Sequence, residues 1–172
     1  MTRTNTSIKL TPHFTLSELT KSATALRMGF DNCLNPLTPG HTQIISNLST
    51  LCFNILEPVR EHFNVPFSPS SGYRCLDLND HFNSKRTSQH LKGEAVDFEV
   101  PGVDNLALAN WIAENLDFDQ CILEFYEPGE PNSGWVHCSY VNPENNRNEC
   151  LTISRVGTLL GFPERKTDGN SN

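Results

Sequence analysis

The sequence has no long apolar run. Its most apolar stretch, Leu51–Leu56, is interrupted by Asn54 and falls far short of the roughly 18 to 20 residues that a membrane-spanning helix needs. The opening segment MTRTNTSIKL also lacks the apolar core of a secretory leader. We therefore expect a chain without a membrane span, made in the cytoplasm without a signal peptide.

Clustered basic residues are also scarce. The 13 Lys and Arg residues are outnumbered by 20 Asp and Glu, which gives a formal net charge of −7. Only Lys85-Arg86 and Arg165-Lys166 are adjacent. Because binding to nucleic acid through its phosphates requires a patch of Lys and Arg, this composition argues against a nucleic-acid-binding protein.

The six cysteines lack the closely spaced pairs of a zinc ribbon. They stand at positions 33, 52, 75, 121, 138 and 150. A cytoplasmic origin favours thiols over disulfides, so we expect free, partly buried cysteines.

What is present fits one compact domain. With 172 residues, 37% of them hydrophobic, the chain is long enough to bury a core without disulfides or structural metals. We predict a single domain over residues 1–160, a disordered polar tail over residues 161–172, and a monomer.

Two helices are predicted from their cap residues. Thr15-x-x-Glu18 is a capping box, in which the threonine accepts from the backbone of the first turn and the glutamate reaches back to the cap. Asp104 predicts the start of another helix that runs to about Leu116.

A longer core helix is predicted between these two. Thr38 followed by Pro39 suits a helix start, and apolar residues recur at helical spacing as far as Val59. Pro58 removes a backbone donor, so we expect a kink or a loose last turn.

The remaining segments predict strands and one long loop. Residues 66–84 are rich in Ser, Pro, Asn and Gly and predict a loop with a short strand at 71–74. Residues 93–100 alternate, with Asp97 facing opposite to its apolar neighbours. Further strands are predicted at residues 121–125, 135–140 and 151–155. The pattern predicts an α+β fold with a small antiparallel sheet and flanking helices.

Three residues suit a metal site. His90 and Asp97 are both zinc-ligand types, and a turn at Gly93 allows their side chains to converge. His137 is the best candidate for a third ligand, because it lies on a predicted strand with Trp135 on the same face. Three protein ligands leave a fourth position open, as in a catalytic zinc site. Another divalent metal that takes imidazole and carboxylate ligands is the alternative.

The order of motifs resembles a known family. The motifs are FTLSEL from Phe14, SSGYRC from Ser70, Leu78-Asn79, SxHxxGxAxD from Ser88 to Asp97, and Trp135-Val136-His137. Over residues 12–156 this order resembles the M15 family of zinc D-Ala-D-Ala peptidases, and most closely its short phage-type subgroup. The resemblance implies a hedgehog/DD-peptidase-like fold and Zn²⁺ bound by the two histidines and the aspartate. It also implies peptidoglycan stem peptides as substrate.

The resemblance further implies residues that bind substrate. Arg74, the arginine of the GYR element, is implied to bind near the scissile bond, and Ser88 is implied to hydrogen-bond substrate. A guanidinium suits this role because it can clamp a carboxylate or stabilise a developing oxyanion. Trp135 is expected to shape the pocket wall.

No single motif identifies the general base. In some members of the family an acidic residue stands three positions before the last histidine, where this chain has Gly134. Glu124 is our candidate, because apolar neighbours on its strand would desolvate it and raise its pKa. Glu127 and Glu130, in the turn that follows, are the alternatives.

These residues predict a zinc metallopeptidase that cuts peptidoglycan stem peptides. We expect a phage or prophage endolysin that reaches the cell wall in the periplasm after release, or a wall-degrading part of a virion. The cleaved bond stays open between D-Ala-D-Ala, D-Ala-diaminopimelate and L-Ala-D-Glu. The alternative function is a non-catalytic wall-binding or virion structural module that keeps the fold, which the glycine at position 134 leaves open.

Overall fold

The computed structural model describes residues 8–164. The sequence predicts a disordered tail over residues 161–172. Residues 165–172 of this segment lie outside the described part of the chain. The helical elements are α1 (Leu16–Thr20), α2 (Ala23–Met28), α3 (His41–Leu51), the π-helical turn η1 (Cys52–Leu56), α4 (Glu57–Phe63), α5 (Leu76–His81), the 3-10 helix η2 (Gln89–Lys92) and α6 (Asn105–Asn115). The strands are β1 (Ala95–Phe98), β2 (Gln120–Glu124), β3 (Trp135–Ser139), β4 (Glu149–Ser154) and β5 (Gly157–Leu160).

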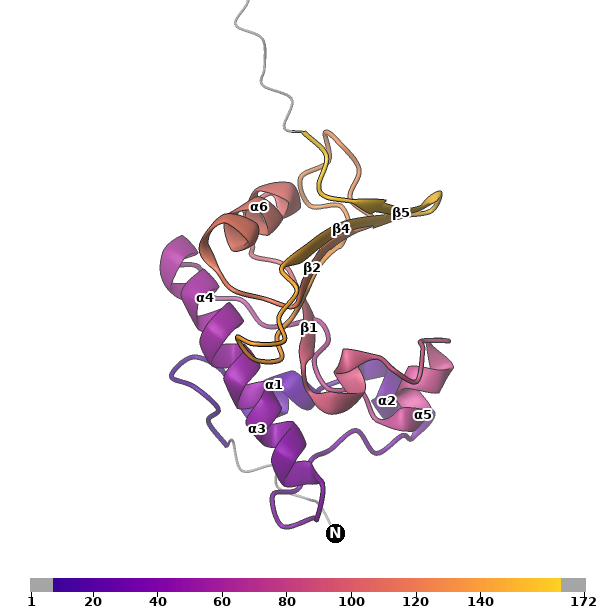
Figure 1. The fold of residues 1–172 in the computed structure, drawn as a ribbon. Coiled ribbons are helices and arrows are strands. Elements are labelled where there is room, and N and C mark those ends of the chain that lie inside the picture. Colours follow the sequence, from indigo (N-terminus) through magenta and orange to yellow (C-terminus); the bar gives the residue numbers. More distant parts are fainter. Residues whose placement is uncertain (1–7, 165–172) are drawn as a thin grey trace, which may run out of the picture.

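The five strands form one sheet in the order β1-β3-β2-β4-β5. In Figure 1, α3, η1 and α4 run as one continuous helical rod along one side of the molecule, and α6 lies above them against the sheet. The β4–β5 hairpin and the lobe that carries α2 and α5 stand apart on the other side. The predicted α+β class is confirmed.

The sheet is mixed, which corrects the prediction of a purely antiparallel one. β4 runs parallel to β2, whereas the other neighbouring strands are antiparallel. The C-terminal end of β3 and the N-terminal end of β4 both lie at the edge of the sheet where β2 starts. Residues 140–148 therefore connect β3 to β4 along that edge, and β4 runs in the same direction as β2. β5 was not predicted, and it is exposed along its whole length.

The two faces of the sheet have different side chains. On one face, Val96, Phe98, Leu123 and Val136 are buried in the main core, to which α6 contributes. On the other face, register pairs Asp97 with His137 and Glu124 with Trp135. Paired residues of neighbouring strands share a face, so the polar side chains all lie on the side away from α6.

The predicted caps of two helices are confirmed. Thr15 and Glu18 form the capping box of α1, with both reciprocal hydrogen bonds present. Asp104 caps α6, because its carboxylate accepts from the backbone of Ala107 at 2.8 Å.

The start of the long helix is different from the prediction. Thr38 lies in a turn, and Gly40 has a φ of +87°, which separates Pro39 from the helix that begins at His41. The predicted disturbance by Pro58 is present as η1, since a proline has no N–H to donate to the carbonyl one helical turn earlier.

The predicted loop over residues 66–84 contains a helix, α5, that the sequence did not indicate. Leu78 and Asn79 of this short helix are buried, so tertiary packing holds it rather than any strong local signal. The predicted strand at 71–74 is reduced to one bridge between Ser71 and Asp97. None of the six cysteines forms a disulfide, as predicted, and Cys52, Cys121 and Cys138 are buried.

No helix within residues 8–164 has both the length and the apolar character needed to cross a membrane.

Candidate metal centre

The three predicted ligands come from three neighbouring pieces of backbone. His90 lies in η2, Asp97 in β1 and His137 in β3, directly opposite Asp97 in the register. The turn between the first two depends on Gly93, which has a φ of +72°. A Cβ at Gly93 would also lie 2.7 Å from the carbonyl oxygen of Ile44, so this position requires glycine on two grounds.

The ligand atoms of these residues converge on one point. One donor atom from each of the three lies within 4.8 Å of the others. His90 Nε2 is 3.4 Å from Asp97 Oδ1, and His137 Nδ1 is 2.8 Å from the same oxygen. The side chains of His90, Asp97 and His137 are only 4%, 8% and 12% exposed, respectively. Two imidazole nitrogens and one carboxylate oxygen form a donor set that fits zinc.

Outer hydrogen bonds hold the ligands in this orientation. His90 Nδ1 lies 2.7 Å from the carbonyl oxygen of Gly72, which can only accept, so Nδ1 carries the proton and Nε2 presents its lone pair. Arg74 Nη2 donates to Asp97 Oδ2 at 2.5 Å, and Arg74 Nε donates to Ser71 Oγ at 2.9 Å. Arg74 therefore fixes the carboxylate so that Oδ1 faces the histidines.

The protonation states also suit metal binding. Burial alone would raise the pKa of Asp97, but the two neighbouring histidines, His90 first and then His137, outweigh it, and the pKa is lowered. Burial lowers the pKa of His90, and nearby His137 and Arg74 act in the same direction. Both effects favour an ionised carboxylate and a neutral imidazole, which are the forms that ligate metal.

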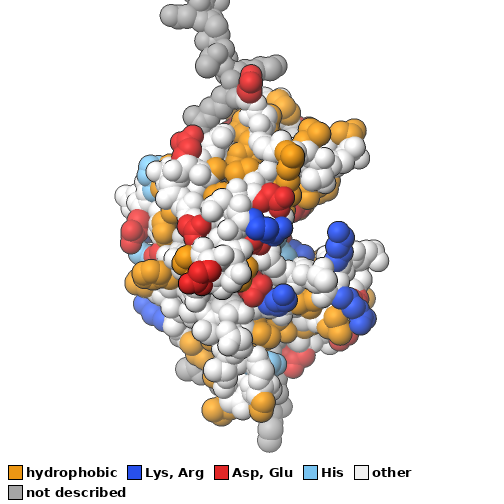
Figure 2. Space-filling model, in the orientation of Figure 1, with side chains coloured by type: hydrophobic (Ala, Val, Ile, Leu, Met, Phe, Trp, Pro, Cys, Tyr) orange, Lys and Arg blue, Asp and Glu red, His pale blue; other side chains and the backbone are white. Residues whose placement is uncertain are grey.

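The ligands lie in an open cleft of about 840 Å³. Figure 2 shows the molecule hollowed on its right side, with Lys and Arg side chains around the hollow. One wall is the polar face of the sheet and the other is the segment from Phe82 to Gln89. The lining residues are Arg74, Phe82, Ser84, Lys85, Thr87, Ser88, Gln89, His90, Asp97, Gln120, Ile122, Glu124, Trp135, His137, Arg147 and Ile153.

The structure brings most of the predicted site residues to this cleft. Arg74, Ser88, Trp135 and Glu124 all line it with the three ligands. Glu127 and Glu130 do not line the cleft. Both are exposed, and their backbones form an isolated β-bridge in the β2–β3 turn.

The environment of Glu124 raises the pKa of its carboxyl group. It is half-buried, and its burial raises its pKa, to which the charge of Asp97 adds. His137 and Arg74 act against this shift without reversing it. A carboxylate with a raised pKa beside a candidate metal site is a candidate for proton transfer.

The departure from the family pattern at position 134 has a steric cause. Gly134 has a φ of +65°, and a Cβ there would lie 1.9 Å from the carbonyl oxygen of Glu124. No side chain fits at this position, so an acidic residue three positions before His137 is excluded in this chain.

A cluster beside the site was missed by the sequence analysis. Asp119, which is 3% exposed, accepts from Gln89 and from the guanidinium of Arg147. Because Gln89 precedes the ligand His90, this cluster ties η2 to the start of β2 and the approach to β4. Only the long-range pairing of these segments creates it, so no local motif marks it.

A buried His–Asp–His set in an open cleft, with a carboxylate of raised pKa beside it, is a candidate mononuclear metal site of the kind that metallohydrolases use. The chain belongs to the Peptidase M15 family, whose model matches residues 12–139 and so includes all three ligands and Glu124. No curated protein matches the chain. Membership makes this a zinc-dependent peptidase of the cell-wall type, as predicted, with His90, Asp97 and His137 as its candidate metal site.

Proposed function

We propose that the protein hydrolyses peptide bonds in the stem peptides of peptidoglycan, with His90, Asp97 and His137 binding zinc and Glu124 acting as general base. The single observation that carries this proposal is the position of Glu124, which lines the same cleft as the three ligands and has a raised pKa. We further propose that the enzyme acts in phage or prophage lysis, or as part of a virion. The motif resemblance to the short phage-type subgroup supports that role.

The chemistry needs a proton carrier and an anchor for the substrate. Zinc, when bound, supplies a Lewis acid that polarises the peptide carbonyl and activates water for attack. Glu124 would take a proton from the attacking water and deliver it to the leaving amine, and its raised pKa favours accepting that proton.

Arg74 has two roles in this proposal. Its bond to Asp97 orients a metal ligand, and its remaining N–H groups line the cleft, where they donate to the substrate carbonyl or carboxylate. Ser88 and Trp135 line the cleft beside it and contact the peptide.

The deciding experiment is digestion of purified peptidoglycan by the zinc-loaded protein, followed by mass spectrometry of the released muropeptides. The masses identify which of the three candidate bonds is cut. We expect Glu124→Gln to keep its zinc, measured by elemental analysis, and to lose at least about 10²-fold in kcat, the usual contribution of a general base. His137→Ala should lose both zinc and activity.

Glu127→Gln and Glu130→Gln are the matched controls, because both residues are exposed carboxylates of the same turn that do not line the cleft. Full activity in both is expected. Loss of activity in either one, with Glu124→Gln active, would move the base to the turn. If the zinc-loaded wild-type protein leaves peptidoglycan intact, the chain is the non-catalytic module instead.

A further inference from the structure

The cleft carries more positive charge than the rest of the chain leads one to expect. The whole protein has a net charge of −7, yet three cationic side chains, Arg74, Lys85 and Arg147, line the cleft against two carboxylates, Asp97 and Glu124. Arg74 is paired with Asp97. Lys85 and Arg147 are the other two cationic side chains of the cleft lining.

Arg147 is held rigidly at one end of the cleft. Its Nε donates to Asp119 Oδ1 and its Nη2 to Asp119 Oδ2, each at 2.7 Å, so the buried carboxylate grips one edge of the guanidinium. The side chain is still 54% exposed. Its Nη1 has only a long contact of 3.3 Å to Glu149. Asp119 thus fixes one edge of the guanidinium, and the exposed N–H groups beyond it can donate to a ligand carboxylate in place of the long contact to Glu149.

The register of the sheet places this cation relative to the metal site. His137 is opposite Ile122 on β2, whereas Glu149, which contacts Arg147, is opposite Gln120. Two residues along a strand correspond to roughly 6 to 7 Å, the length of about two residues of an extended peptide. Glu124 lies two residues from Ile122 in the other direction, so Arg147 and the general base mark opposite ends of the cleft.

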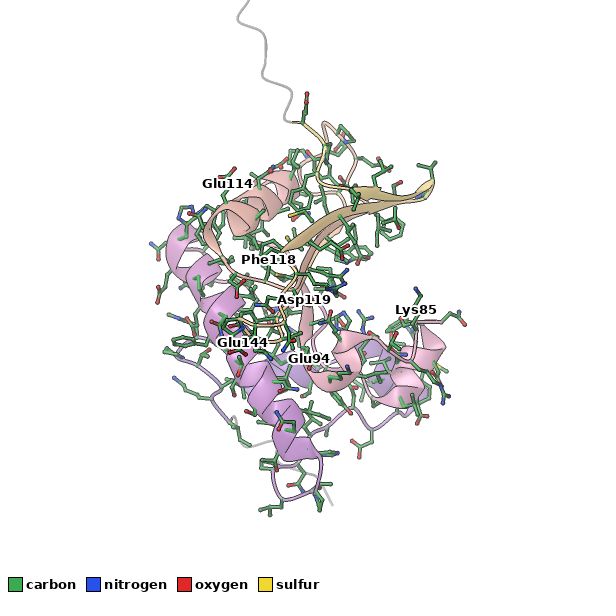
Figure 3. The ribbon with its side chains drawn as sticks, viewed as in Figure 1. Lys85, Glu94, Glu114, Phe118, Asp119 and Glu144 are labelled. Carbon is green, nitrogen blue, oxygen red and sulfur yellow. The ribbon has the colours of Figure 1, made fainter. Side chains whose placement is uncertain are left out.

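Lys85 lies on the opposite wall. It is exposed, and within residues 8–164 no carboxylate pairs with its ammonium group. Figure 3 shows it on the lobe that carries α5, across the open side from the β4–β5 hairpin, while Asp119 lies at the inner end of the gap. The unpaired charge costs little in water, but it attracts an anionic ligand that enters between the walls.

We propose that the cleft selects peptides with a free carboxylate about two residues from the scissile bond, bound by Arg147 and attracted by Lys85. This inference rests on the proposed peptidase function and names its substrate class, an acidic peptide. Arg147 and Lys85 are specificity residues and take no part in the proton transfer.

The test compares two forms of one synthetic stem peptide, one with free side carboxylates and one in which these are amidated. For the wild-type enzyme we expect kcat/KM to be at least about tenfold higher on the free form, the size of one charge-assisted hydrogen bond. Lys85→Gln and Arg147→Gln should each reduce this ratio several-fold while activity on the amidated peptide persists. Arg86→Gln is the matched control, because Arg86 pairs with Asp80 and does not line the cleft.

The outcomes separate the two proposals. Equal cleavage of both peptides by the wild-type enzyme overturns this inference and leaves the peptidase proposal intact. A preference that persists in both variants overturns it as well. Cleavage of neither peptide by zinc-loaded protein sinks the peptidase proposal itself. If Arg147→Gln does not fold because Asp119 loses its partner, the test uses Lys85→Gln and high salt instead. Loss of the preference for the free carboxylates in both supports the proposal, and a preference that persists in both overturns it.

Discussion

Gly134 lies directly before β3, at the end of the β2–β3 turn, and it occupies the position where some members of the family have an acidic residue. A Cβ at this residue would lie 1.9 Å from the carbonyl oxygen of Glu124 and 2.6 Å from the backbone of Phe125. These are backbone atoms that cannot rotate away. A carboxylate for the proposed proton transfer therefore has to come from another element, and Glu124 of β2 lines the cleft.

Replacing this glycine should be costly. We expect Gly134→Ala to lower the free energy of unfolding by more than about 2 kcal/mol, because a backbone clash adds to the penalty for positive φ. Gly129→Ala is the control, since Gly129 also has a positive φ but a Cβ there would meet nothing within 4 Å. Urea unfolding of both variants measures the difference. Equal losses would mean that the β2–β3 turn relaxes around the new methyl group.

The pKa of Glu124 leads to a prediction for the pH dependence. A general base works only when deprotonated, and burial raises the pKa of Glu124 above its ordinary value of 4.5. As pH falls, kcat should decline at a higher pH than it would for an exposed glutamate. The pH profile of kcat measures this limb, and Glu124→Gln should abolish it. An acid limb that is unchanged in the residual activity of this variant would assign it to another group.

At the scale of elements, the site depends on how each segment is started and stopped. The cap at Asp104 fixes where α6 begins, and α6 packs against β2 and β3, which carry Glu124 and His137. The cap carboxylate accepts from Ala107 and also from the hydroxyl of Tyr126, just beyond β2. One side chain thus ties the helix to the turn that follows the strand.

Removing this cap should destabilise the protein moderately. We expect Asp104→Ala to cost about 1 kcal/mol, the usual value of an N-cap. Glu114→Ala, at an exposed position near the other end of the same helix, should change stability by less than about 0.5 kcal/mol. Thermal unfolding checks both values. A loss in the control as large as that in Asp104→Ala would show that helix composition matters more than the cap.

At the scale of the whole molecule, a buried carboxylate joins the start of the described chain to the helical rod. Glu57 of α4, which is 6% exposed, accepts from the backbone nitrogen of His13 at 2.9 Å and lies 2.6 Å from its Nδ1. Burial alone would raise the pKa of Glu57, but its polar neighbours Thr11 and His13 outweigh it and lower the pKa.

This contact predicts how stability depends on pH. A carboxylate whose pKa is lower in the folded state contributes stability above its unfolded value, here 4.5, and that contribution is lost as pH falls through the folded value. Below pH 4.5 the wild-type protein should therefore lose free energy of unfolding more steeply than Glu57→Gln does. Urea unfolding between pH 3 and pH 6 compares the two. Parallel curves would show that Glu57 does not contribute to this acid sensitivity.

Local sequence determined the parts of the protein that depend on neighbouring residues. The caps at Thr15 and Asp104 act within one helical turn, and alternation along a strand fixes which face each side chain takes. The spacing from His90 to Asp97 around Gly93 is local as well. For this reason the candidate metal ligands and the α+β class could be predicted from the residues, whereas Arg74 and Ser88 were implied by the resemblance to the family.

Only the tertiary structure decided the features that need distant segments to meet. The buried environment that holds α5, the parallel pairing of β4 and the Asp119–Arg147 cluster all join segments that are separate in the sequence. The same holds for the clash that forbids a side chain at Gly134. The sequence by itself therefore indicated His90, Asp97 and His137 as candidate metal ligands, whereas the pairing of β1 with β3 brings His137 opposite Asp97. Packing decided which carboxylate and which cations stand beside these ligands, because desolvation and proximity arise only once the chain is folded.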